Sequence, residues 1–374
     1  MENDNQFEYF LERAEQGDAE AQFNLGILYD DGNGVPQDDR KALDWYRRAA
    51  EQGYDPAQFQ LAIFYMQGRE VLLSLGKAAE WFRKAAERGN PDAQTMLAIM
   101  CRDGMGMSRD YAEAAEWFRK AAEQGDDDAQ FGLGCFYAHG AGVEQDHLKA
   151  VDWYLKAAKQ GNVDAQYNLG YAYESGEGVP QDYDKAADWY HSAAEQGDTH
   201  AQVNLGNLYR EGRGVPKDKE TAKYWFQKAA EQGETVGQFN LEAAQFNDAE
   251  FPVEPESFGE STFLTDGGDH LKHGIGLDQE NEALDEWVRE AAEEGDPQSQ
   301  YRLGNWYRYK LEEGSDYSEA AEWYRQAAEQ GHTEAQMELG AMYENGLGVP
   351  QDPEEAAKWY RQALSLPEDD DSED

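Results

Sequence analysis

The sequence repeats itself every 36 residues. An Ala-Gln pair begins at residues 21, 57, 93, 129, 165 and 201, and a Trp recurs in the same register. Gln238 and Gln300 then lie 62 residues apart, 26 more than the period, and the 36-residue step resumes at Gln336. A period of about 20–50 residues is typical of repeat arrays, whose units bury their apolar faces against one another. We therefore expect a stack of small units instead of two or three globular domains.

Each unit contains two predicted helices. In the first unit, small and apolar residues between Ala21 and Tyr29 fall at i, i+4, i+7 and i+8, and those between Ala42 and Ala50 at i, i+3, i+4, i+7 and i+8. Both spacings indicate one apolar helix face. The intervening GNGVPQD predicts a turn, with Asp38 as N-cap of the second helix, and Gly53 is expected to end that helix in a left-handed conformation.

Small residues and aromatic pairs are expected to pack the helices. Gly26 and its equivalents lack a side chain, so they predict close approach of two backbones. A Trp followed by Tyr or Phe recurs in the second helix of eight units. Since a buried aromatic side chain removes about 150–250 Å² from water, the Trp-Tyr pairs are expected to dominate the stability of each interface between repeats.

The unit resembles the Sel-one-like repeat family, a branch of the tetratricopeptide-like proteins. Matching residues follow the pattern Ala-x3-Leu-Gly-x2-Tyr, Gly-x-Gly-Val and Lys-Ala-x2-Trp-Tyr-x2-Ala-Ala. The resemblance implies an all-α, right-handed superhelical solenoid of nine antiparallel helix pairs. Glu70 and Glu312 replace the second loop glycine, and Met107 replaces the loop valine, so these three loops are where the conformation could differ.

The period divides the chain into consecutive segments, which are a capping helix, nine repeats and a tail. Repeat seven carries an insertion at about 246–281. The segments are a capping helix at 1–17, repeats one to six at 18–233, repeat seven at 234–295, repeat eight at 296–331, repeat nine at 332–366 and a disordered acidic tail at 367–374.

The chain is strongly acidic, with 77 Asp and Glu against 32 Lys and Arg, a net charge of −45. Nucleic acid is excluded as a partner because its binding depends on basic residues that replace phosphate counterions. The charge favours a basic protein partner, although it is equally compatible with a role in solubility or with a saline habitat.

Candidate catalytic residues are few. The loop glycines have neither the preceding strand nor the Lys-Ser/Thr of a phosphate-binding loop, and the histidines have no repeated nucleophile beside them. Asp266, Asp269, His270 and His273 in the insertion could bind a divalent metal if they converge. Otherwise the sequence predicts a protein that is not an enzyme and holds no cofactor.

A partner-binding face follows from the tetratricopeptide analogy, in which the first helix of each pair lines the concave wall. Phe131, Tyr167 and Tyr171 would supply aromatic anchors there. The acids that border them are Asp128, Asp164 and Glu174. The alternative is that the level of Phe131 and Tyr167 belongs to the core, because spacing alone does not separate buried from wall-facing rings.

The predicted function is a monomeric scaffold or adaptor that binds a protein with a basic surface. One alternative is an immunity protein or inhibitor that masks a toxin or enzyme. A metal-dependent enzyme with its site at 246–281 and a purely structural spacer are further alternatives. The N-terminal sequence has acids where a signal peptide has basic residues, and no stretch is apolar enough for a membrane span, so a cytoplasmic location without membrane contact is expected.

Overall fold

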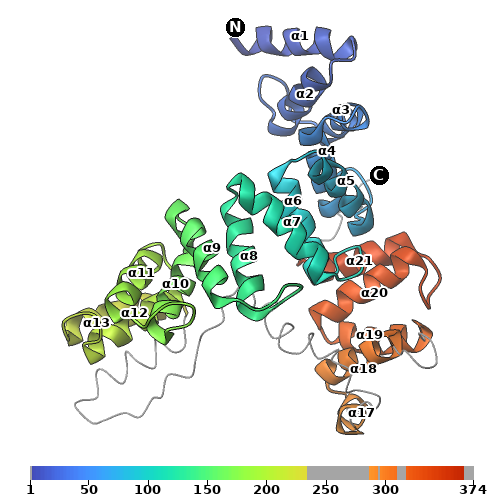
Figure 1. Ribbon diagram of the computed structural model, residues 1–374. Helices are drawn as coiled ribbons and strands as arrows, with labels where there is room; N and C mark the ends of the chain where they lie inside the picture. Colours follow the sequence, from blue (N-terminus) through green and yellow to red (C-terminus); the bar gives the residue numbers. More distant parts are fainter. Residues whose placement is uncertain (1, 234–285, 294, 310–316, 366–374) are drawn as a thin grey trace. The chain divides into compact units, whose positions relative to one another are not determined.

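The computed structural model describes residues 2–233, 286–293, 295–309 and 317–365, and every regular element in these ranges is a helix. Successive helices pack in antiparallel pairs that follow the 36-residue unit (Figure 1). The prediction of an all-α solenoid of repeated helix pairs is confirmed. The right-handed superhelix stays a prediction.

The two helices of a unit alternate along the chain, after an N-terminal helix α1 (Glu2–Glu15). The first helices are α2 (Ala19–Asp31), α4 (Asp55–Gln67), α6 (Pro91–Asp103), α8 (Asp127–His139), α10 (Val163–Ser175), α12 (Thr199–Glu211), α18 (Pro297–Tyr309) and α20 (Thr333–Asn345). The second helices are α3 (Asp39–Glu51), α5 (Leu75–Glu87), α7 (Tyr111–Gln124), α9 (His147–Gln160), α11 (Tyr183–Glu195), α13 (Lys219–Glu231), α17 (Glu286–Glu293), α19 (Tyr317–Glu329) and α21 (Pro353–Ala363).

The helix ends confirm the predicted caps. The Asp38 side chain accepts a hydrogen bond from the backbone N–H of Lys41, 3.0 Å away, which satisfies one of the free donors at the start of α3. Gly53 has a φ of +85°, as expected for a left-handed residue after a helix. Glu70 keeps a φ of +53° although it replaces a glycine, so this loop retains its left-handed residue.

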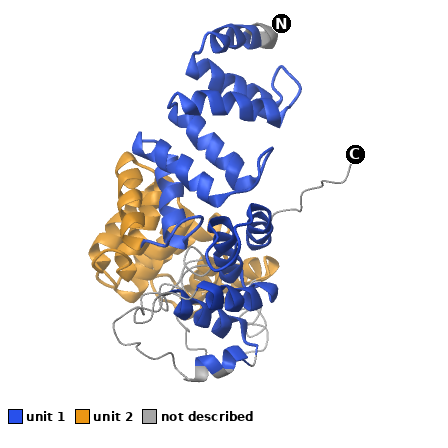
Figure 2. Ribbon diagram, turned by 90° about the vertical axis from the view of Figure 1, so that its right-hand side faces the viewer, with its two compact units in different colours: residues 1–110, 278–374 blue, residues 111–277 orange. Residues whose placement is uncertain are grey.

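The chain divides into two compact units (Figure 2). Unit 1 comprises residues 1–110 and 278–374, and unit 2 comprises residues 111–277. The described part of unit 2 consists of α7 to α13. Its core holds Tyr167, Tyr190 and Trp225 with alanines and leucines of α11 and α12.

Glycines inside the first helices make room for an aromatic ring. A Cβ on Gly170 would lie 2.5 Å from the Tyr190 ring, a separation that side chains do not tolerate. The same contact joins Gly26 to Tyr46, Gly134 to Tyr154, Gly206 to Phe226, Gly304 to Tyr324 and Gly340 to Tyr360. The expectation of a tight contact at these glycines is met, but the atoms that approach belong to an aromatic ring and not to a second backbone.

The ring that enters this space belongs to the second residue of the Trp-Tyr pair. Tyr190 is fully buried, whereas Trp189 before it is only half-buried. Several tryptophans are instead covered by a basic side chain from the next turn of the same helix. Lys156 Nζ, for example, lies 3.3 Å from the centre of the Trp153 ring. Only the Tyr or Phe fills the space above the glycine, although Trp117, Trp225 and Trp359 are also buried. That the Trp-Tyr pairs dominate the stability of each interface between repeats stays a prediction.

A buried glutamine bonds to the preceding repeat and to the end of the second helix of its own repeat. Gln166 donates through Nε2 to the Ala158 carbonyl, 3.2 Å away, and accepts at Oε1 from Gln196 Nε2, 2.8 Å away. The same glutamine pairs form at 22 and 52, 130 and 160, 202 and 232, and 300 and 330. These pairs, called the glutamine ladder below, give both polar atoms of a buried amide a partner, as burial requires.

Candidate functional site

Two of the predicted anchors lie in the core. Phe131 on α8 is 1% exposed and Tyr167 on α10 is 3% exposed. Their ring centres lie 5.8 Å from those of Tyr154 and Tyr190, respectively. Phe131 and Tyr167 therefore support the face from behind and have almost no surface of their own for a partner.

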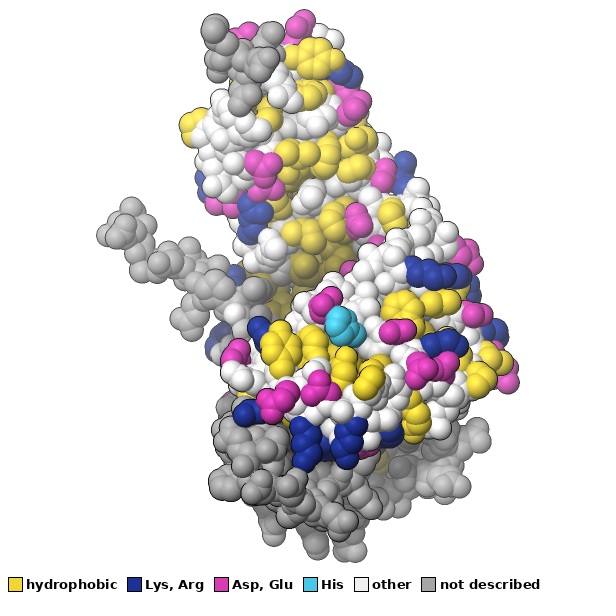
Figure 3. Space-filling model, turned by 90° about the vertical axis from the view of Figure 1, so that its left-hand side faces the viewer, with side chains coloured by type: hydrophobic (Ala, Val, Ile, Leu, Met, Phe, Trp, Pro, Cys, Tyr) yellow, Lys and Arg dark blue, Asp and Glu magenta, His cyan; other side chains and the backbone are white. Residues whose placement is uncertain are grey.

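Tyr171 lies one helical turn beyond Tyr167 and is half-buried, with its inner side packed against the core of unit 2. Such a ring is held in place and still exposes area, which is the usual property of an anchor at an interface. The side of the molecule drawn in Figure 3 has hydrophobic side chains in separate patches, with acidic and basic groups between them.

Glu174 lies within the same helix as Tyr171 but has structural partners. Its Oε2 accepts a hydrogen bond from the Tyr190 hydroxyl at 2.9 Å, and its Oε1 lies 3.6 Å from Arg213 Nη2. Burial raises the pKa of Glu174, against the lowering effects of the Tyr190 hydrogen bond and of Arg213. Glu174 therefore links two repeats, and a substitution there would disturb the core as well as the surface charge.

Asp128 and Asp164 occupy equivalent positions in the first turns of α8 and α10. Asp128 is exposed and accepts a hydrogen bond from Asn162 Nδ2 at 3.0 Å. Asp164 is half-buried, and partial desolvation, followed by the charges of Asp198 and Asp128, raises its pKa. The N-terminus of a helix favours a negative charge, but here desolvation and the neighbouring carboxylates outweigh that effect.

The pKa of Asp198, the N-cap of α12, is also raised by burial. The charges of Asp198 and Asp128 thus both disfavour the ionised form of Asp164. A cation placed beside them would relieve the repulsion and lower these pKa values. The arrangement is therefore suited to receive a basic group, and Tyr171 adds an apolar contact on the same helix as Asp164.

Asp164→Asn is expected to raise the urea midpoint of unfolding at pH 7. A folded-state pKa above the unfolded value means that the ionised carboxylate destabilises the fold at neutral pH, and this cost disappears once both states are protonated below the ordinary value of 3.8. The gain should therefore vanish on acidification to pH 3. The matched control is Asp152→Asn on the exposed side of α9. A gain of the same size at pH 3 and pH 7 would contradict the electrostatic origin.

The interpretation of the sequence missed the role of the glutamines. Gln22, Gln130, Gln166 and their equivalents marked the period, and their partners recur 30 residues later, close to the end of the same unit. The combination of a glutamine every 36 residues with a second glutamine 30 residues after it was the signal for this pairing. It also exposes one irregular position, Arg88, where the other complete ladder pairs have glutamine.

The predicted metal ligands Asp266, Asp269, His270 and His273 lie outside the described residues, as do the rest of the insertion and the acidic tail. Within the described ranges, no group of three His, Cys, Asp or Glu side chains is placed to hold a metal. Among the helices of those ranges, none has the length and apolar character needed to cross a bilayer.

The Sel1 repeat model matches eight segments of this sequence. They are residues 19–54, 55–90, 91–126, 127–162, 163–198, 199–234, 297–332 and 333–367. The chain belongs to the Sel1 repeat family. Proteins built from Sel1 repeats are typically non-enzymatic scaffolds for protein interactions. The eight matches correspond to the predicted units except the seventh, which carries the insertion.

Two solved Sel1 repeat structures are similar over long stretches. A protective antigen of uropathogenic Escherichia coli strains is 38% identical, with 96% of this chain and 79% of that chain covered and a TM-score of 0.62. A Sel1 repeat protein from Oxalobacter formigenes is 36% identical, with 57% of this chain and 86% of that chain covered and a TM-score of 0.52. Curated proteins give no match.

An immunity protein from Pseudomonas aeruginosa is also similar, at 24% identity and a TM-score of 0.38, with 64% of this chain and 90% of that chain covered. Similarity at this level says nothing about a shared function. The immunity role therefore stays a prediction from the acidic sequence.

Proposed function

We propose that this protein is an interaction scaffold that binds a basic segment of a protein partner against the first-helix face of unit 2. Tyr171 is the apolar anchor, and Asp128 and Asp164 are the groups that attract the partner's Lys or Arg side chains. Glu174 adds negative charge while it holds Tyr190. Phe131 and Tyr167 position the helices from within the core.

The observation that carries the proposal is the row of carboxylates with raised pKa values beside a half-exposed ring. Surface acids without a function normally lie far enough apart, or close enough to basic residues, to keep ordinary pKa values. Here burial and neighbouring acids disfavour the negative charge of these carboxylates. A cationic partner that neutralises this charge would therefore bind with a more favourable free energy. The family's usual role as a scaffold supports the same proposal.

Tyr171→Ala is expected to weaken binding of the partner by about 2–4 kcal/mol at any salt concentration, because loss of a central aromatic anchor usually has an effect of this size. The partner is first identified by capture on the immobilised chain from an extract of the source cells, and its affinity is then measured by surface plasmon resonance. Tyr224→Ala is the matched control, because Tyr224 is a ring on the second helix α13 and is 52% exposed. Equal affinity for wild type and a folded Tyr171→Ala would contradict this face.

Asp128→Lys tests the contribution of the acidic side chains separately from that of the Tyr171 ring. Rim charges act mainly on the association rate, so the rate should fall at low salt and approach the wild-type value near 1 M, where the Debye length is about 3 Å. Asp188→Lys makes the same change at an exposed position of α11 and is the control. Glu174 is unsuitable for this test because its carboxylate holds Tyr190.

A further inference from the structure

The start of α5 in the second repeat departs from the repeated sequence. Leu73 and Ser74 stand where the other units have a polar side chain followed by aspartate. These aspartates are Asp38, Asp110, Asp146, Asp182, Asp218, Asp316 and Asp352. Leu73 is 1% exposed and Ser74 is 8% exposed. The equivalents of Leu73 are open to solvent at Gln37, Gln145, Gln181, Lys217 and Gln351. A part of the chain therefore covers the start of α5 and leaves the same position of these repeats open.

The ninth repeat reaches this position through Glu344 of α20. Ser74 Oγ donates to Glu344 Oε1, and the backbone nitrogen of Gly76 lies 3.3 Å from each oxygen of the same carboxylate. Nearby, a Cβ on Gly68 at the end of α4 would lie 3.5 Å from Arg361 Nη2 of α21. Ser74 and Glu344 are 270 residues apart in the sequence, yet both belong to unit 1, blue in Figure 2.

The contact replaces one that a following repeat makes elsewhere. Glu174, at the position of Glu344 in its own unit, is bound by a tyrosine hydroxyl of that unit and faces Arg213 of the next one. Asp30 has the same two kinds of partner, with Arg69 as the cation. Glu344 keeps the tyrosine hydroxyl of its own unit, at 2.9 Å, but its other donors come from the start of α5. The second repeat thus takes the place of a following repeat.

The sequence departures in the second repeat fit a carboxylate. Ser74 Oγ accepts from the backbone N–H of Lys77 at 3.2 Å and still donates to Glu344, whereas an ionised aspartate accepts only and would repel a second carboxylate. Gly76 leaves room, because a Cβ there would lie 3.1 Å from Glu344 Oε1. A side chain occupies this position in the other units, as Leu148 does in α9. The N-terminus of α5 itself favours the negative charge.

We propose that the start of α5 is an interaction surface for the chain's own ninth repeat. Ser74, Gly76 and Glu344 then form a clasp that opens and closes while both repeats stay folded. The buried core of the ninth repeat lies between Tyr301 and Trp359, and that around α4 lies between Ala42 and Phe64, so neither core includes the clasp. The clasp lies within unit 1 and is independent of the face of unit 2.

Ser74→Asp is expected to open the clasp by charge repulsion. The variant should fold, because Asp38 caps α3 in the same way and pairs with Lys41, and Lys77 stands at the corresponding position of α5. Gly76→Leu should open the clasp by bulk instead of charge. Both variants are expected to keep the helical circular dichroism signal of wild type.

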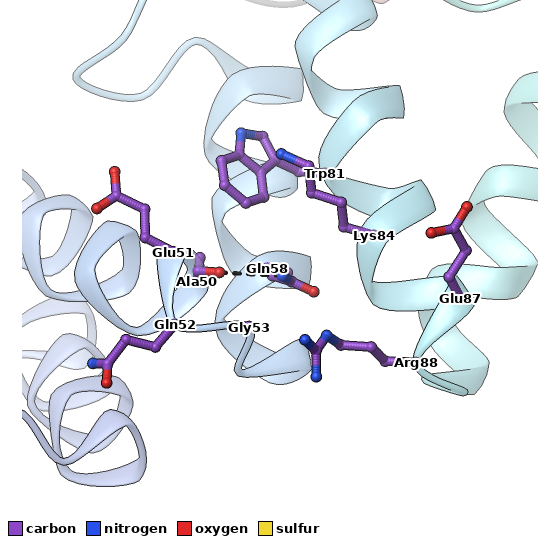
Figure 4. A pocket seen from close by; sticks show the side chains of 9 residues that line it. All are labelled: Ala50, Glu51, Gln52, Gly53, Gln58, Trp81, Lys84, Glu87 and Arg88. Atoms are coloured by element: carbon purple, nitrogen blue, oxygen red, sulfur yellow. Dashed lines mark hydrogen bonds between the residues drawn. The ribbon is translucent and has the colours of Figure 1, made fainter.

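Opening is measured in the full chain by double electron–electron resonance between nitroxide labels at Glu87→Cys and Glu354→Cys. Both positions are exposed, and the two native cysteines are buried. Glu87 lies at the other end of α5, on the rim of the open hollow beside Trp81, so its label does not touch the clasp (Figure 4). The narrow distance peak of wild type is expected to be lost in Ser74→Asp and in Gly76→Leu. An unchanged peak in either folded variant would overturn the proposal.

Glu344→Gln in the Ser74→Asp background is the rescue. Its amide NH₂ donates to the new carboxylate while its oxygen still accepts from Tyr360, so the narrow peak should return. The same substitution in the Gly76→Leu background should not restore it. Asp38→Ser, the reverse change at α3, is the control and should leave the peak unchanged. A peak that disappears when labelled chains are mixed with excess unlabelled chain would assign the contact to two copies and overturn the clasp.

Discussion

Gly142→Ala is expected to lower the free energy of unfolding by about 2–5 kcal/mol. Gly142 has a φ of +62°, where an L-residue costs about 1–2 kcal/mol. A Cβ would also lie 2.2 Å from the Tyr111 carbonyl oxygen and 2.6 Å from the Ala112 nitrogen. These are backbone atoms that no rotamer change can move, and overpacking of this kind costs about 1–3 kcal/mol more.

The contact recurs along the chain and joins successive repeats. The second loop glycine of one unit packs against the start of the second helix in the unit before it, as at Gly178 against His147 and Gly214 against Tyr183. Gly142→Ala should therefore loosen the interface between α7 and the loop after α8. Urea unfolding followed by circular dichroism measures the total effect, and hydrogen exchange locates it.

Gly125→Ala is the control for the backbone contribution. Gly125 also has a positive φ, +103°, but a Cβ there would have no atom within 4 Å. Its replacement should cost only the conformational strain of about 1–2 kcal/mol. If both variants lose the same stability, the glycine is required for its conformation and not for the contact between repeats.

Tyr190→Ala is expected to destabilise the chain by about 3–5 kcal/mol, the usual cost of removing a fully buried aromatic side chain. The ring fills the space above Gly170 and its hydroxyl donates to Glu174. Trp189→Ala removes the larger neighbouring ring, but Trp189 is half-buried, so a smaller loss is expected. The two urea midpoints, compared with wild type, measure the difference.

Tyr190→Phe separates packing from hydrogen bonding. It keeps the ring and leaves the Glu174 carboxylate without its donor, which should cost about 1–3 kcal/mol. A loss for Trp189→Ala equal to or greater than that for Tyr190→Ala would contradict the larger contribution of the buried tyrosine.

Much of the fold followed from local patterns. The 36-residue period and the helical spacing within it predicted the helix pairs, and Asp38 and Gly53 marked helix ends because caps depend on a few adjacent residues. The candidate site was less predictable. Phe131 on α8 and Tyr167 and Tyr171 on α10 were assigned by spacing to the same side of the first helices, yet the first two are buried and the third is half-buried.

The sequence by itself determined the repeat, the helices, their caps and the family, because these depend on residues close together in the chain. Only the tertiary structure decided which member of the Trp-Tyr pair fills the space above the glycine and which aromatic residues keep exposed area. Burial and pairing depend on which neighbouring helix covers a side chain, and periodicity defines a face without specifying what packs against it.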